Sequence, residues 1–222
     1  MATNAVSVAG THIRVTSLNP DGTPKVGAES SYVTSAFISV SMTPEFEEGD
    51  EFTQKAADGS VCGTVKMPDT LKRVGLEVAV CSPDPDFTHI IAGGTKLTDP
   101  GDPDGETLGW AAPEIGTDAL PNGVAIEVWS RAYENGKPAA VNPYFHWLFP
   151  YAVMRPGGDR VIENGMLATS FEGWGVGNDN FGDGPAAPLW PSISDRAYAY
   201  IRVPAAPTGQ SGFVNVVAPT TP

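Results

Sequence analysis

The sequence predicts a mainly β fold with one short helix, and three observations carry that prediction. Apolar residues alternate with small or polar ones in several short segments, which is the pattern of strands with one buried face. The chain of 222 residues contains 25 glycines and 21 prolines, which favours many turns between short strands. Because 41% of the residues are hydrophobic, the chain can still bury a sizeable core.

Period-two alternation predicts eight strands. In residues 74–80 every second side chain is an apolar Val or Leu, and Glu77 lies on the other face. Residues 124–129 repeat the arrangement, with Glu127 facing outward. The same pattern predicts strands at residues 12–18, 34–42, 49–54, 60–66, 197–203 and 213–217.

One helix and one tight hairpin are predicted from local signals. Asp84 or Asp86 can cap a first helical turn beside two prolines, an apolar stripe follows, and Gly93-Gly94 ends the helix. This helix is expected to pack against the sheet. Asn135-Gly136 is a hairpin turn signal.

Long loops are expected within a single domain that spans residues 1–222. The acidic segment 99–106 is expected to be an exposed loop. Two extended loops are predicted near residues 42–60 and 164–191, since the second is rich in Gly, Asn, Asp and Pro and shows little periodicity.

The charge balance argues against nucleic-acid binding. The formal net charge is −13, and the basic residues are scattered, with only Lys72 and Arg73 adjacent. No apolar run is long enough to cross a membrane, and the N-terminus lacks the features of a signal peptide, so a soluble protein made in a cytoplasm is expected. Cys62 and Cys81 are too few for a disulfide framework and are expected to be reduced and partly buried.

No catalytic or metal site is expected. His12, His89 and His146 lie far apart without the paired spacing of zinc ligands. The aspartates of the 99–106 segment are interrupted by prolines and fit a solvated loop better than a calcium loop. Ser60 lacks the surroundings of a nucleophile elbow. We therefore expect no enzyme, no cofactor and no metal.

Five tryptophans keep a carbohydrate-binding module open as an alternative. Their rings could form a sugar-stacking face, although most are expected in the core or at interfaces. They are the residues at positions 110, 129, 147, 174 and 190.

Two regions resemble the major tail tube protein of long-tailed bacteriophages, in particular of phages that infect actinobacteria. The first is residues 46–97, where an acidic turn is followed by two strand-like runs and the short helix. The second begins with the aromatic run NPYFHWLFP at residues 142–150, continues with IENG at 162–165 and ends with the loop that closes at Gly184-Pro185. The similarity is one of layout and covers most of the chain.

The resemblance implies a structural role. Proteins of this family fold as a β-sandwich or barrel flanked by a helix, form rings of six, and stack the rings into the hollow tube that conducts DNA from the capsid. The implied partners are further copies of the chain, the tape measure protein, the tail terminator and distal tail proteins, and transiting double-stranded DNA that is not specifically bound. The implied location is the virion tail, assembled in the host cytoplasm.

The resemblance also suggests roles for particular residues. Glu77 and Glu127 are the candidates for charge that faces the lumen. An acidic turn, with nearby lysines, is the candidate stacking loop between rings: Glu45, Glu47, Glu48, Asp50, Glu51 and Lys55. Aromatic residues are the candidate subunit interface, since such residues favour buried contacts: Phe145, Trp147, Phe149 and Trp174. A capsid decoration protein or a tail terminator would also be rich in β-strands and lack catalytic residues, and the sequence leaves both open.

Overall fold

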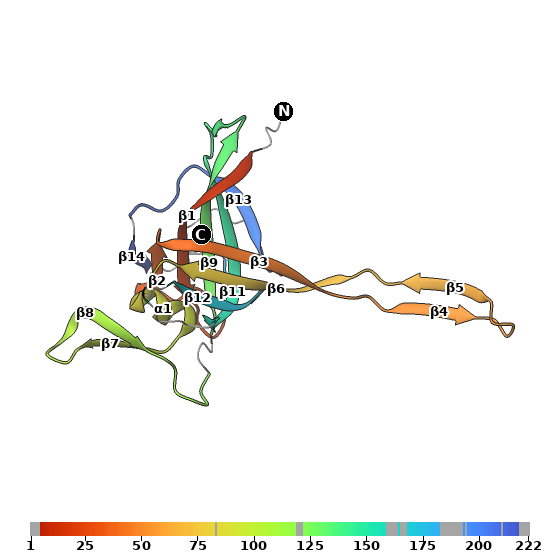
Figure 1. Ribbon diagram of the computed structural model, residues 1–222, viewed down its shortest axis with the longest axis horizontal. Coiled ribbons are helices and arrows are strands. Elements are labelled where there is room, and N and C mark those ends of the chain that lie inside the picture. Colours follow the sequence, from red (N-terminus) through yellow and green to blue (C-terminus); the bar gives the residue numbers. More distant parts are fainter. Residues whose placement is uncertain are drawn as a thin grey trace.

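The computed structural model describes residues 5–82, 84–118, 122–158, 164, 168–182, 193, 195–209 and 211–217 (Figure 1). The chain is mainly β with one short helix, α1 (Pro85–Ala92), as predicted. The strands are β1 (Val6–Ser17), β2 (Gly27–Thr34), β3 (Phe37–Glu47), β4 (Glu51–Lys55), β5 (Val61–Lys66), β6 (Thr70–Val80), β7 (Thr95–Asp99), β8 (Asp102–Ala111), β9 (Val124–Glu134), β10 (Lys137–Pro138), β11 (Tyr144–Gly157), β12 (Thr169–Val176), β13 (Ala199–Val203) and β14 (Ser211–Val216).

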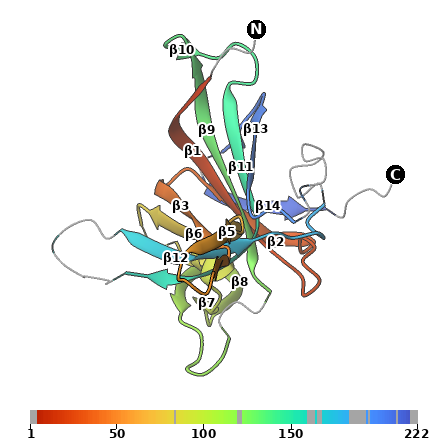
Figure 2. The same cartoon turned by 90° about the vertical axis from the view of Figure 1, so that its right-hand side faces the viewer.

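Ten strands form one large antiparallel sheet. Its order is β14-β2-β1-β9-β11-β12-β6-β3, while β10 pairs with β9 and β13 pairs with β11. The long strand β11 changes neighbours along its length. Its first half lies between β9 and β13, and its second half, residues 151–157, pairs with β12. The four strands β3, β6, β12 and the end of β11 therefore form a distinct part of the sheet (Figure 2).

The main core lies between this four-stranded part, the rest of the sheet and α1. The alternation in β6 buries its apolar face completely, with Val74 and Val78 fully inaccessible. Phe87 and Ile91 of α1 meet that core, together with Phe171 of β12. Asp84 caps the helix as predicted, because its side chain accepts hydrogen bonds from the backbone N–H groups of Asp86 and Phe87.

A second core covers the opposite face of β9. Ala125 of β9 packs there with Leu148 of β11, and Phe181 and Ile193 from the C-terminal part of the chain complete the cluster. Because both faces of β9 are covered, the outward position predicted for Glu127 is wrong: the residue is 1% exposed. The alternation in β9 separates its two faces correctly, but the second face is also covered, and there Arg14 of β1 and His146 of β11 meet the carboxylate of Glu127.

The predicted strands and turns are largely confirmed. Each of the eight predicted segments corresponds to an observed strand. Asn135-Gly136 forms the two-residue turn between β9 and β10, with positive φ at both residues.

Three local predictions are corrected. The segment 99–106 is not a free loop, since Asp99 faces Asp102 across a tight turn and β8 continues the hairpin. Part of the predicted loop 164–191 is strand β12, whose alternation is obscured by Gly173 and Gly175; much of the remainder lies outside the described residues. Both cysteines are exposed and not partly buried.

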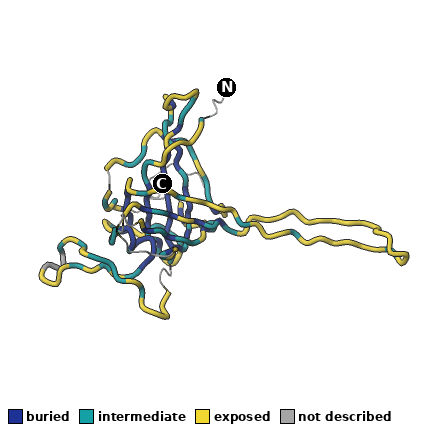
Figure 3. Tube along the Cα trace, in the orientation of Figure 1, coloured by how far each residue is buried: buried dark blue, intermediate teal, exposed yellow. Residues whose placement is uncertain are grey.

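The predicted extended loop at 42–60 is instead part of a long two-stranded ribbon. Strand β3 continues into β4, and β5 leads back into β6, so that residues 46–71 project from the body (Figure 1). We call these residues the arm. Nearly all of the arm is exposed (Figure 3).

Candidate functional site

A polar face covers the four-stranded part of the sheet, on the side away from the core. Strand registers place one row of side chains across it, in the order Ser41, Glu77, Glu172 and Arg155. The same face is hollowed into an open trough of about 660 Å³. Glu77, a predicted lumen residue, is exposed on this face.

Two ion pairs lie in the trough. Arg155 donates to Glu172 at 2.8 Å, and Arg73 donates to Glu45 at 2.6 Å, at the root of the arm. Within the described part of the chain, the carboxylate of Glu77 has no hydrogen bond or ion pair. The trough thus carries three carboxylates against two guanidinium groups and is acidic by one charge. Glu77 and Glu172 face each other directly, which is an unfavourable pairing within one sheet.

Trp174 lines the same trough. It lies opposite Gly75 in the register of β12 and β6, and 36% of its surface is exposed. The sequence analysis placed Trp174 at a subunit interface, and that assignment stays a prediction. Glu172 was not predicted to lie on this face, because the glycines of β12 hide the alternation of that strand. Arg155, near the end of β11, was also missed.

Glu127 belongs to a buried ionic cluster and not to the surface. Arg14 of β1 binds its carboxylate with two nitrogen atoms, at 2.5 and 2.6 Å, and His146 of β11 lies 2.9 Å from it. His146 stacks on Trp129 at a centroid distance of 4.2 Å, and the Arg14 guanidinium lies over the same ring. Burial by itself raises the pKa of Glu127, but the Arg14 charge and the hydrogen bonds from His146 and Arg14 outweigh it and lower the pKa to about 2.

Two of the four residues predicted for an aromatic interface are internal. Phe145 and Phe149 are 9% and 2% exposed, because β11 is flanked by β9 and β13. Phe149 packs in the main core, and Phe145 packs in a small separate cluster with Ala132 and Ala139. These two residues are therefore corrected to core positions. Trp147 is only partly buried and lines an apolar groove beside β3.

The arm holds all but one of the residues predicted for a stacking loop. Glu45 lies just before the arm and pairs with Arg73 of the same protomer, whereas the others are exposed along the ribbon: Glu47, Glu48, Asp50, Glu51 and Lys55. No role was predicted from the sequence for the apolar side chains of the arm. Six of them, each more than 40% exposed, lie from the arm's root to its tip: Phe46, Phe52, Val61, Val65, Met67 and Leu71.

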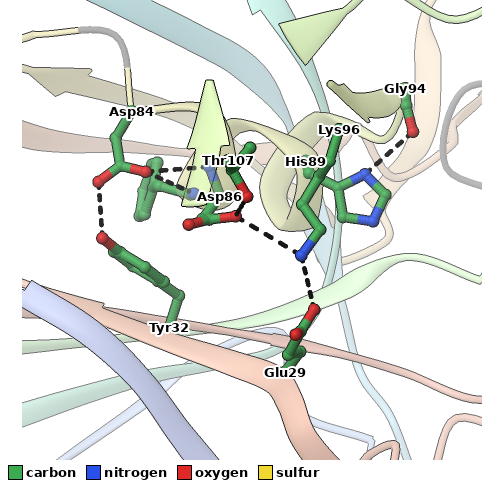
Figure 4. Close-up of polar contacts among 9 residues, drawn as sticks. Glu29, Tyr32, Asp84, Asp86, His89, Gly94, Lys96 and Thr107 are labelled. Atoms are coloured by element: carbon green, nitrogen blue, oxygen red, sulfur yellow. Dashed lines mark hydrogen bonds and ion pairs between the residues drawn. The ribbon is translucent and has the colours of Figure 1, made fainter. Parts of the chain in front are cut away.

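A polar network fastens the other hairpin, β7–β8, to the body (Figure 4). Lys96 of β7 binds Glu29 of β2 at 2.5 Å and lies 3.6 Å from Asp86 of α1. Thr107 of β8 donates to Asp86. Burial opposes the charge of Lys96, but the hydrogen bond from Lys96 to Glu29 and the two nearby carboxylates raise its pKa overall.

The helix cap extends this network. The hydroxyl of Tyr32 donates to Asp84 at 2.7 Å. Burial and the bond to Asp84 both raise the pKa of Tyr32. Strand β2, α1 and the β7–β8 hairpin are thus joined by charged and hydrogen-bonded side chains, as Figure 4 shows.

In the described residues, no group of three or more His, Cys, Asp or Glu side chains is placed to hold a metal ion. No helix in the described part of the chain is long and apolar enough to cross a membrane. No protein-family model matches the chain, and no curated protein matches it.

Proposed function

We propose that the protein is a structural subunit of a bacteriophage virion, six copies of which form a ring, and that stacked rings build the hollow tail tube of a long-tailed phage. The observation that carries this proposal is the four-stranded part of the sheet. One of its faces is packed on the core and the other is polar, and it has a free edge on each side. Such a unit can be repeated by joining edges.

The two free edges suit a closed ring. Among the described residues, β3 has no neighbour on the side away from β6, and residues 153–157 of β11 have none on the side away from β12. An even number of antiparallel strands separates these edges, so they run in opposite directions. Copies related by rotation would therefore meet as antiparallel neighbours, which removes exposed edges. In the assembled state the sheet would become a barrel.

The polar face then lines the tube. Glu77, predicted for the lumen, lies on this face with Glu172 in place of Glu127. Six copies would repeat their carboxylates around the bore. At physiological ionic strength such charges act over roughly 8 Å, which is enough to discourage adhesion of a DNA backbone at short range.

The arm is the element that reaches beyond its own ring. It projects well outside the body and carries both the predicted stacking residues and exposed apolar side chains. In this proposal the tape measure protein, the tail terminator and distal tail proteins and passing DNA are the further partners. The protein has no catalytic role and takes no cofactor.

Negative-stain electron microscopy of the purified protein over a range of concentrations tests the proposal. Stacked hollow tubes are the expected result. Single rings that never stack would instead support a tail terminator. A tail-tip complex is added to a second series of samples as an initiator of assembly. If the protein remains trimeric or monomeric at every concentration in that series as well, the tube assignment is overturned and a decoration protein is favoured.

A further inference from the structure

An apolar groove lies beside the free edge of β3. It has a volume of about 320 Å³ and runs between β3 and strands β1, β9 and β11. Trp147 and Phe149 are among the residues that line it, and Ile38 and Met42 of β3 form its outer side. Ile38 is 57% exposed and Met42 is 36% exposed. None of the described residues that line the groove is charged.

The arm presents an apolar surface of the same character. Phe52 faces Val65 across the ribbon, and both are 60% exposed. At the root, Phe46 faces Leu71 in the same way. A two-stranded ribbon has no interior of its own, so these side chains remain in water unless another surface covers them.

We propose that the apolar face of the arm docks in this groove on a second copy of the chain. The inference rests on the proposed function, since it names the surface that receives the arm. The arm points away from its own body, so its tip cannot fold back into the groove of the same protomer (Figure 1). Contact between the apolar side chains of the arm and those of the groove removes apolar area from water without stripping solvent from ions.

This contact is directional. One copy gives the arm and the next receives it through a different surface, so the interface is heterologous and can build rings or open stacks. The acidic and basic residues of the arm, including Lys55, then lie at the solvated rim. The sequence predicted that these charged residues make the contact between rings. In this proposal, Phe52 and Val65 make the main contact instead.

Chemical cross-linking tests the docking directly. Two single-cysteine proteins are made in a Cys62→Ser, Cys81→Ser background: Val65→Cys on the arm and Ile38→Cys in the groove. They are mixed and treated with a short bismaleimide. We expect the mixed cross-link to exceed, by at least about tenfold, that formed between Val65→Cys and a control, Leu108→Cys, which is 67% exposed on the β7–β8 hairpin. Equal yields would overturn the proposal.

Assembly measurements provide a second test. Phe52→Ser or Ile38→Glu is expected to raise the concentration at which assembly begins at least about tenfold, whereas the control Leu108→Glu leaves it unchanged. Circular dichroism checks that each variant is folded. Tubes without the cross-link would overturn the docking and leave the proposed function standing. Cross-linked chains that never form tubes would support the docking and overturn the tube.

Discussion

Two hairpins extend from the main sheet, and they are attached in opposite ways. The β7–β8 hairpin is bound to the body by Lys96, Thr107 and Trp110, whose ring N–H donates to the carbonyl of Gly93 at 2.7 Å. The hydrogen bonds found for the described residues beyond the root of the β4–β5 arm remain within the arm itself, such as Thr53 with Thr64. Among the described residues, the arm displays six exposed apolar side chains, whereas the β7–β8 hairpin displays two, Leu97 and Leu108.

The contrast indicates that the first hairpin is part of the fold, and it fits our proposal that the arm binds a second copy of the chain. A hairpin whose charged groups are satisfied by the body gains its order during folding. A two-stranded ribbon with exposed apolar side chains gains little stability from its own protomer. It is stabilised when another surface covers those side chains. Variants in the body, in the hairpin and in the arm test this difference in attachment.

The largest expected effect is in the body that carries both hairpins. Glu127→Ala leaves the Arg14 charge buried without its partner, and we expect a loss of roughly 3–5 kcal/mol in the free energy of unfolding. Urea titration measures it. Glu48→Ala, at an exposed site on the arm, is the control and should change stability by less than about 0.5 kcal/mol. Similar values for the two variants would contradict the comparison.

Acid should weaken the body through the same residue. The folded-state pKa of Glu127 is about 2, below the ordinary value of 4.5, so its contribution is present above pH 4.5 and is lost as the pH falls toward 2. The loss is a few kcal/mol, on the order of 1.4 kcal/mol for each pH unit in that window. Thermal unfolding at pH 6 and pH 3 measures it, and Glu127→Gln should flatten the difference. If the Glu127→Gln variant loses the same stability between pH 6 and pH 3 as the unmodified protein, the acid effect arises from other residues.

Asp84→Ala should loosen the attachment of the β7–β8 hairpin through α1. The variant removes the helix cap and the acceptor for Tyr32, which together cost about 1–2 kcal/mol. We expect faster hydrogen exchange in α1 and in β7, with the arm unaffected. Asp84→Asn retains a capping oxygen and is the matched control. Equal acceleration of exchange in the arm would show that the two hairpins are coupled.

Lys96→Met should have a smaller effect. Its partner Glu29 is well exposed, so the pair is screened and contributes at most about 1 kcal/mol. The expected result is a slight loss of stability that shrinks at high salt. Lys55→Met on the arm is the matched control and should leave unfolding unchanged at every salt concentration.

The smallest effect on unfolding is expected in the arm. Phe52→Ser combined with Val65→Ser should change the free energy of unfolding by less than about 0.5 kcal/mol, since both side chains are already exposed. The same variant should lose assembly. Urea titration and sedimentation of the same sample measure the two outcomes, and a large loss of stability would mean that the arm belongs to the fold.

The prediction from sequence was best where local chemistry decides the structure. The cap at Asp84, the turn at Asn135-Gly136 and the alternation in β6 depend on neighbours within a few residues. Strand β12 was missed because glycines at 173 and 175 leave no alternating side chains to read.

The candidate site was only partly predictable. Glu77 was placed on the outward face of its strand, and it lies there. Glu127 has the same local pattern and is buried, because Arg14 and His146 from two other strands meet its carboxylate. Period-two alternation separates the two faces of a strand but does not say whether the polar face meets water.

By itself, the sequence determined the class of fold, the position of the helix and most strands, and the concentration of charge at residues 45–51. The tertiary structure decided which polar residues remain on the surface, that residues 46–71 form a projecting ribbon, and that β11 divides its length between two sets of neighbours. The physical reason is that propensity and alternation act over a few residues, whereas burial depends on segments more than a hundred residues apart, such as Arg14 and Glu127.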